Sequence, residues 1–393
     1  MTRRSGKLQE TPMGVALKPL EEQVIVITGA SSGIGRAAAE MAAERGARLV
    51  LAARNEDALR EVAGECIRRG GQAVVVAADV AKREDIERIA KVATESFGGI
   101  DTWVNDAAVA LYGDVRQLPI EDQRRQFEVN YWGVVNGSLV AAEHIGRRGG
   151  GAIINIGSVL SDRAMAYQTQ YSATKHAVKA FTDGLRMELE AAGAPISVTL
   201  IKPSSINTPY PEHARNDMGA QALTLPPPVY DPHLVGKAIL FAAEHPKRTL
   251  VVGLGGYMIS LMGTHFPRLT DYAMEMTGYA SQTTDRPGAR ERQRRDNLYG
   301  PREDGGRSSL PVSERRTSLF LEAQMHSVAT FALFAGFGLA LAYALAGSGP
   351  RQRHAFNAAR RTGRRREDAA RVAMAHHPRG DGEARASSGL ARH

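Results

Sequence analysis

Residues 28–35 read TGASSGIG, and they follow directly on the apolar run QVIVI at residues 23–27. A strand that turns sharply into a helix needs glycine at the turn, and glycine also lets the backbone approach a pyrophosphate closely. The helix that begins there presents free N–H groups and its positive dipole end to a phosphate. The stretch therefore predicts a strand, a turn and a helix that bind a dinucleotide. The predicted phosphate-binding residues are Gly29, Ser31, Ser32, Gly33, Ile34 and Gly35.

Apolar runs alternate with longer helical stretches from Gln23 to about Gly255. The runs are continuous in Val, Ile and Leu, which is typical of strands covered on both faces. Strand–helix alternation predicts an α/β fold, a doubly wound parallel sheet that binds ligands at the carboxyl ends of its strands. The predicted strands are residues 23–29, 47–53, 72–79, 100–107, 151–158, 196–203 and 249–254.

The end of the second predicted strand bears on the choice of cofactor. It reads Ala52-Ala53-Arg54-Asn55, without the Asp or Glu that binds the ribose hydroxyls in NAD-dependent proteins. Arg54 can pair with a 2′-phosphate, and Arg36 after the last glycine can assist. The alternative for Arg54 is a solvated surface charge. The missing acid favours NADP(H).

Tyr171 and Lys175 lie four residues apart, so on a helix they share one face. A free phenol has a pKa near 10, and a nearby ammonium favours the phenolate and lowers that pKa. The tyrosine can then exchange a proton with a carbonyl or alcohol oxygen. Ser158, at the end of the run GAIINIGS, can hold the substrate oxygen beside it.

TGASSGIG, Asp79, Asn105, Ser158, Tyr171 and Lys175 occur in the order and at the spacing of a known family. The chain resembles the classical short-chain dehydrogenases/reductases over about residues 23–263. The resemblance implies a Rossmann-type fold. It also implies an enzyme that interconverts a small carbonyl and an alcohol with NADP(H). In that family the tyrosine is the general acid/base, and the lysine also binds the nicotinamide ribose. The other residues that the resemblance implies are Asp79 and Val80 at the adenine, Asn105 and Thr208 at the cofactor, and Asn130 anchoring a water in a proton relay.

Two departures from the family pattern concern the cofactor loops. Asn105-Asp106-Ala107-Ala108 stands where the family commonly has Asn-Asn-Ala-Gly, and Pro203-Ser204 stands where it has Pro-Gly. Neither departure removes a proton-transfer group. The proline-rich stretch from Pro209 to Pro232 matches the place of the family's substrate lid.

Two rival interpretations remain open at this point. One is a non-catalytic nucleotide-binding or scaffolding protein at the membrane, against which the set Ser158, Tyr171 and Lys175 argues. The other is an epimerase or dehydratase, which the glycine spacing disfavours.

The chain carries a formal net charge of +8, but residues 351–393 alone hold eleven Arg against four acidic residues, which is +7. A nucleic-acid-binding surface on the folded domain is therefore not expected. No His or Cys cluster surrounds the single cysteine, Cys66, so no metal site is expected either. A homo-oligomer stays open.

Composition divides the chain into five predicted parts. They are a tail (1–20), the Rossmann catalytic domain (21–265), a charged arm or linker (266–326), an apolar helix (327–349) and a basic tail without a core of its own (350–393).

The apolar helix has no charged residue, and about twenty residues at about 1.5 Å each span about 30 Å, the thickness of a bilayer core. It predicts membrane association through 327–349 and the basic tail. The alternative is a buried or oligomerisation helix. The N-terminal residues lack the apolar run of a signal peptide, so we expect the catalytic domain in the cytoplasm. The helix either enters one leaflet or spans the bilayer. Deleting residues 320–393 is expected to release an active enzyme.

Overall fold

The structure of the protein is a computed structural model that describes residues 15–219, 222–286, 289–293, 295–302, 305–308, 312–326 and 330. Apart from Thr330, the predicted apolar helix and the basic tail lie outside the described residues, as does most of the N-terminal tail. Within the described ranges, no helix is both long enough and apolar enough to cross a bilayer.

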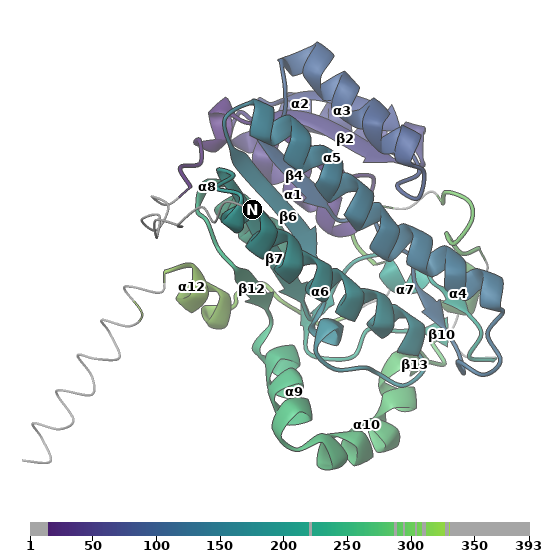
Figure 1. Ribbon diagram of the computed structural model, residues 1–393. Helices are drawn as coiled ribbons and strands as arrows, with labels where there is room; N and C mark the ends of the chain where they lie inside the picture. Colours follow the sequence, from purple (N-terminus) through teal and green to yellow (C-terminus); the bar gives the residue numbers. More distant parts are fainter. Residues whose placement is uncertain are drawn as a thin grey trace, which may run out of the picture. The chain divides into compact units, whose positions relative to one another are not determined.

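The predicted parallel sheet is confirmed, with seven strands in the order β12-β7-β6-β4-β1-β2-β3 (Figure 1). Because β4 follows β3 in the chain but pairs with β1, the order reverses between β1 and β4. A doubly wound sheet binds its ligand at this switch point. The strands are β1 (Val24–Thr28), β2 (Arg48–Ala53), β3 (Gln72–Ala77), β4 (Thr102–Asn105), β6 (Gly151–Ile156), β7 (Ile196–Pro203) and β12 (Thr249–Val252).

Helices cover both faces of the sheet, because successive strand residues point to opposite sides. Ile25 and Ile27 of β1 belong to a buried cluster with helices α1, α2 and α8. Val24 and Val26 belong to a second cluster with α3, α5 and α6. The helices are α1 (Gly33–Glu44), α2 (Glu56–Arg68), α3 (Arg83–Phe97), α5 (Gly133–Arg147), α6 (Thr169–Ala191) and α8 (Pro232–Glu244).

Short elements gather at the carboxyl ends of the strands. The predicted lid, 209–232, is built from such short pieces rather than from one helix or strand. The remaining helical elements are η1 (Leu20–Glu22), α4 (Ile120–Phe127), η2 (Glu128–Trp132), η3 (Val159–Ser161), α7 (Tyr210–His213), α9 (Leu254–His265), α10 (Pro267–Gln282), α11 (Ala289–Arg292) and α12 (Leu319–Met325). The short strands are β5 (Leu111–Tyr112), β8 (Ser205–Ile206), β9 (Arg215–Asn216), β10 (Ala222–Leu223), β11 (Val229–Tyr230), β13 (Thr283–Thr284) and β14 (Glu314–Arg315).

The region predicted as a charged arm, 266–326, differs from that expectation. Its described residues belong to the same compact unit as the sheet. The strand β14 pairs in parallel with β11, and Leu321 and Met325 of α12 are buried in the cluster that holds α1 and α8. A few apolar residues within this charged composition, such as Leu321 and Met325, attach the region to the domain that holds the sheet.

Candidate active site

A cavity of about 350 Å³ opens at the carboxyl ends of the sheet strands and reaches from the glycine-rich turn to α6. It brings together most of the residues predicted for the site. Those that line it are Gly29, Ser31, Ser32, Gly33, Ile34, Arg54, Asp79, Val80, Ser158, Tyr171, Lys175 and Thr208. The predicted residues Gly35, Asn105 and Asn130 are not part of its lining.

The glycine-rich turn is as tight as its sequence predicts. Gly29 has a φ of +74°, and a Cβ placed on it would lie 2.8 Å from the backbone N of Ala107. A Cβ on Gly35 would lie 2.5 Å from the carbonyl oxygen of Gly29. The cap residue of α1, Ser32, makes no side-chain hydrogen bond to the first turn. The backbone at this helix N-terminus therefore fits a phosphate group.

Ser158, Tyr171 and Lys175 lie together at the other end of the cavity. Ser158 follows β6 and caps η3, where its Oγ accepts a hydrogen bond from the N–H of Leu160 at 3.0 Å. Its hydroxyl also acts to lower the pKa of Tyr171. The Nζ of Lys175 donates to the carbonyl of Ile156 at 2.8 Å and lies 5.6 Å from the centre of the Tyr171 ring.

The electrostatics of this group differ from the expectation that the pKa of Tyr171 is lowered. Burial raises the pKa of Tyr171, and hydrogen bonds from Tyr210 and Ser158 offset only part of that rise. Burial also lowers the pKa of Lys175 to about 8. The raised pKa keeps the Tyr171 hydroxyl protonated at neutral pH.

Asp106, one of the departures from the family pattern, belongs to the same site. It lines the cavity, and a Cβ on Gly35 would lie 3.0 Å from its Oδ2, so the carboxyl packs against the glycine-rich turn. Burial raises its pKa to about 7, whereas the charge of Lys175 and the N–H of Gly35 act to lower it. The sequence identified this position as unusual but did not assign it to the site.

Two further tyrosines in the cavity wall were not predicted. Tyr210 of α7 contacts Tyr171 edge-on, with ring centres 5.5 Å apart, and contacts Tyr112 at 6.0 Å. Its hydroxyl donates to Oε1 of Gln168 at 3.0 Å. Burial raises the pKa of Tyr210 well above its usual value. Tyr210 comes from the predicted lid, and no local pattern in the sequence indicated that its ring faces Tyr171.

Asn105 and Asn130 hold the cavity wall in place from behind. The Nδ2 of Asn105 donates to Oδ1 of Asn155 at 2.8 Å in a buried amide pair. Oδ1 of Asn130 accepts from the N–H of Val109 at 2.8 Å, and its Nδ2 donates to the carbonyl of the same residue at 3.0 Å. Because Val109 lines the cavity, Asn130 fixes this part of its wall, and its Nδ2 also donates to Oγ1 of Thr174 in α6 at 3.2 Å.

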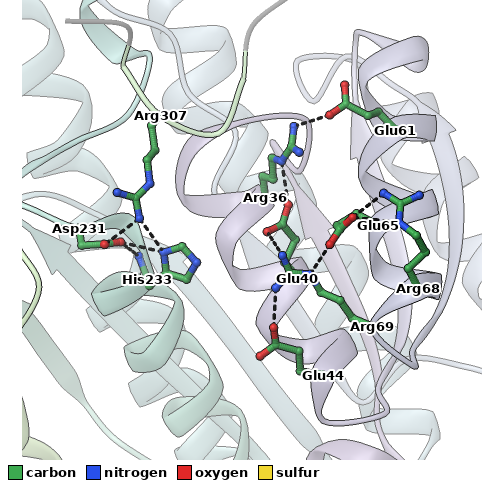
Figure 2. A network of polar contacts seen from close by, with 10 residues as sticks. All are labelled: Arg36, Glu40, Glu44, Glu61, Glu65, Arg68, Arg69, Asp231, His233 and Arg307. Atoms are coloured by element: carbon green, nitrogen blue, oxygen red, sulfur yellow. Dashed lines mark hydrogen bonds and ion pairs between the residues drawn. The ribbon is translucent and has the colours of Figure 1, made fainter. Parts of the chain in front are cut away.

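The two arginines proposed for a 2′-phosphate have different surroundings. Arg54 lines the cavity, but its guanidinium donates to the carbonyls of Asn297 and Leu298, and burial lowers its pKa. Arg36 is not part of the cavity lining; it forms ion pairs with Glu40 at 2.8 Å and Glu61 at 3.0 Å (Figure 2). In this structure the Arg36 guanidinium is therefore paired with carboxylates outside the cavity lining, and not placed to assist Arg54 in binding a 2′-phosphate.

Comparison with known proteins places this site in a family. The family profile described as short chain dehydrogenase matches residues 23–219. The chain is 49% identical over 272 residues to the uncharacterized oxidoreductase YxnA of Bacillus subtilis (strain 168). That match covers 69% of this chain and 76% of the relative.

Two solved structures share the fold. An alcohol dehydrogenase from the archaeon Thermococcus sibiricus, complexed with 5-hydroxy-NADP, has a TM-score of 0.51 and 26% identity over 58% of this chain and 95% of its own. The L-sorbose reductase from Gluconobacter frateurii, complexed with NADPH and L-sorbose, has a TM-score of 0.52 and 27% identity over 61% and 97%. The family profile spans half of the chain and the glycine-rich turn, and this chain belongs to the short chain dehydrogenase family of oxidoreductases.

Proposed function

We propose that this oxidoreductase interconverts a small-molecule carbonyl and an alcohol with NADP(H). The observation that carries the proposal is the shared cavity. It joins a phosphate-binding turn at Gly29 to the hydroxyls of Ser158 and Tyr171 and the ammonium of Lys175. A turn alone would serve a nucleotide-binding scaffold, whereas the hydroxyl pair and the ammonium are suited to proton transfer.

Bound NADPH would supply the hydride, and the chain would supply position and protons. Ser158 would hold the carbonyl oxygen, and Tyr171 would give it a proton as negative charge develops there. Lys175, with a pKa of about 8, carries its positive charge below that pH and would stabilise the phenolate that Tyr171 becomes. A protonated Tyr171 can supply the proton that reduction of a carbonyl requires.

The preference for NADP(H) over NAD(H) rests on the residues after β2. Positions 54 and 55 hold Arg and Asn rather than an acidic residue, and Arg54 lines the cavity. A permanent guanidinium charge favours a phosphate over a hydroxyl. The two structural neighbours described above were solved with NADP-type nucleotides, which supports the same choice.

A turnover screen tests the proposal. Purified full-length protein would be incubated with NADPH or NADH and a panel of ketones, aldehydes and ketoses, and nucleotide oxidation would be followed by absorbance. We expect turnover with NADPH to exceed turnover with NADH by at least about tenfold. Nucleotide binding without turnover of any carbonyl or alcohol would instead favour the scaffolding alternative.

We also propose that the enzyme acts at the cytoplasmic face of a membrane, held there by residues 327–349 and the basic tail. The support is the uncharged apolar stretch followed by eleven arginines. Each arginine near an anionic membrane surface adds about 1 kcal/mol to the free energy of membrane binding.

A further inference from the structure

A short piece of chain far from the family-matched region completes the cavity. Residues 295–302, the strap, lie well beyond residue 219, where the family profile ends. Asn297, Pro301 and Arg302 of the strap nevertheless line the same cavity as the glycine-rich turn. The strap therefore forms part of the cavity wall.

The strap is fixed to the residues that follow β2. The guanidinium of Arg54 donates to the carbonyls of Asn297 and Leu298, and Nδ2 of Asn55 donates to the carbonyl of Arg302 at 3.1 Å. These bonds use backbone carbonyls of the strap. They fix its course beside the cavity, which Asn297 and Arg302 line. The guanidinium of Arg302 donates to the carbonyls of Glu212 and Arg295.

Leu298 anchors the strap in the core. Its side chain is 0% exposed and belongs to the buried cluster that contains Val80. Its carbonyl also accepts from Nε of Arg125 at 3.1 Å, and Arg125 pairs with Asp79 at 2.6 Å. Asp79 and Val80 line the cavity at the end that the family resemblance assigns to adenine, so the strap runs beside that end.

Residues that follow this anchor are also held. The hydroxyl of Tyr299 donates to Oδ1 of Asp122 at 2.7 Å. Farther along, Arg307 pairs with Asp231 at 2.8 Å, next to the ring of His233 (Figure 2). The described residues on this side of Leu298 are thus tied to the catalytic-site elements at Asp122 and Asp231.

Two strap side chains offer groups suited to an adenine nucleotide. Oδ1 of Asn297 is buried and has no hydrogen-bond partner among the described residues. A buried acceptor without a partner costs about 1–3 kcal/mol, which a donor on a ligand would recover. Arg302 adds a permanent positive charge to the wall that Arg54 also lines.

We propose that the strap closes over the adenosine end of NADP(H), with Asn297 accepting a hydrogen bond from the nucleotide and Arg302 binding its 2′-phosphate beside Arg54. The inference rests on the proposed function, because it assumes that this cavity takes NADP(H). It assigns cofactor recognition to a segment outside the region that the family profile matches.

The test uses the full-length protein, two nucleotides that correspond to the adenosine end alone, and the two whole dinucleotides. Dissociation constants for 2′,5′-ADP, 5′-AMP, NADPH and NADH would be measured by calorimetry for wild type, Arg302→Ala and Asn297→Ala. Arg295→Ala is the matched control, because Arg295 is an exposed strap arginine outside the cavity lining. Amide hydrogen exchange of residues 295–302 with and without 2′,5′-ADP reports strap closure without any substitution.

We expect Arg302→Ala to raise the dissociation constants of 2′,5′-ADP and NADPH by about tenfold to a hundredfold. The dissociation constant of NADH should rise far less. Asn297→Ala should raise the dissociation constants of NADPH and NADH alike, and Arg295→Ala should change neither constant. Binding of 2′,5′-ADP should slow amide hydrogen exchange in the strap. Wild-type affinity in both cavity variants, or tighter NADPH binding in them, would overturn the inference while leaving the proposed function in place. Failure of the wild type to bind either dinucleotide would overturn the proposed function and the inference with it.

Discussion

The carboxyl group of Asp106 and the ammonium of Lys175 interact across the active-site cavity, and each stabilises the charged form of the other. Lys175 acts to lower the pKa of Asp106, and Asp106 acts to raise the pKa of Lys175, although burial dominates both values at about 7 and about 8. The negative charge of Asp106 also raises the pKa of Tyr171. The position where the family commonly has a second asparagine thus carries a titratable group.

Asp106→Asn is expected to shift the pH profile of carbonyl reduction. Loss of the negative charge removes the contribution that raises the pKa of Lys175, so that pKa falls below about 8. Reduction needs the Lys175 charge, so the decline of kcat/KM on the alkaline side should begin at lower pH than in wild type. An unchanged alkaline limb would contradict the coupling.

The same variant has a predictable effect on stability. A carboxyl whose pKa rises from 3.8 to about 7 on folding keeps its proton in the folded state after the unfolded state has lost it. The stability of the wild type should therefore fall as the pH rises from about 4 to about 7. Asp106→Asn should lack this contribution, so the variant should gain stability relative to wild type over that interval, as thermal unfolding would measure.

Tyr171→Phe keeps the ring and removes the hydroxyl that transfers the proton. General acid–base catalysis contributes about 10²–10⁴-fold, so the reduction rate should fall by at least about a hundredfold while NADPH affinity changes little. Tyr272→Phe is the matched control, because Tyr272 lies exposed on α10. A variant that kept more than about a tenth of the wild-type rate would disprove the assignment of Tyr171.

Tyr210→Phe tests the hydroxyl cluster around Tyr171. The Tyr210 hydroxyl acts to lower the pKa of Tyr171 against the effect of burial. Removing it should raise that pKa further, so the rise of alcohol oxidation with pH should begin at higher pH. The expected signature is a shift of the rising limb of the pH profile to higher pH. A uniform loss of rate at every pH would indicate a merely structural role.

The parts of this protein that the sequence predicted are those with a local signal. Each strand of the large sheet is a continuous apolar run, and the glycine-rich turn has a spacing that few other structures require. Tyr171 and Lys175 were paired because helix geometry alone places residues four apart on one face.

The parts that the sequence did not predict depend on contacts between distant residues. Leu298 is a single apolar residue in a charged stretch, and nothing nearby indicates that it is buried. Arg54 was assigned to a phosphate, but its hydrogen bonds go to carbonyls more than 240 residues away. Tyr210 reaches Tyr171 through the course of the lid, which no periodicity encodes.

The contacts of α12 bear on one expectation about truncation. Removal of residues 320–393 was expected to leave an active enzyme, but that cut removes nearly all of α12. Leu321 and Met325 of this helix are buried. Gln324 binds the free edge of β12, accepting from the N–H of Val251 and donating to its carbonyl, each at 2.9 Å.

We therefore expect a deletion of residues 327–393 to keep the stability and activity of the full-length protein, and a deletion of 320–393 to lose both in part. Full burial of a Leu or Met side chain contributes about 1.5–3 kcal/mol, so losing Leu321 and Met325 should lower the unfolding temperature by several degrees. Thermal melts and NADPH-dependent turnover of the two truncated proteins, compared side by side, give the readout. Equal stability of the two would show that α12 contributes little to the fold.

The longer of the two truncated proteins also tests the membrane proposal without disturbing the catalytic domain. Full-length protein should sediment with membranes, and protein ending at residue 326 should remain in the supernatant, because it lacks the apolar stretch and the basic tail. High salt should release a part of the full-length protein if the arginines of the tail act through anionic lipid headgroups. Full-length protein found wholly in the supernatant would disprove membrane association, and digestion of the catalytic domain by protease added to intact cells would disprove its cytoplasmic location.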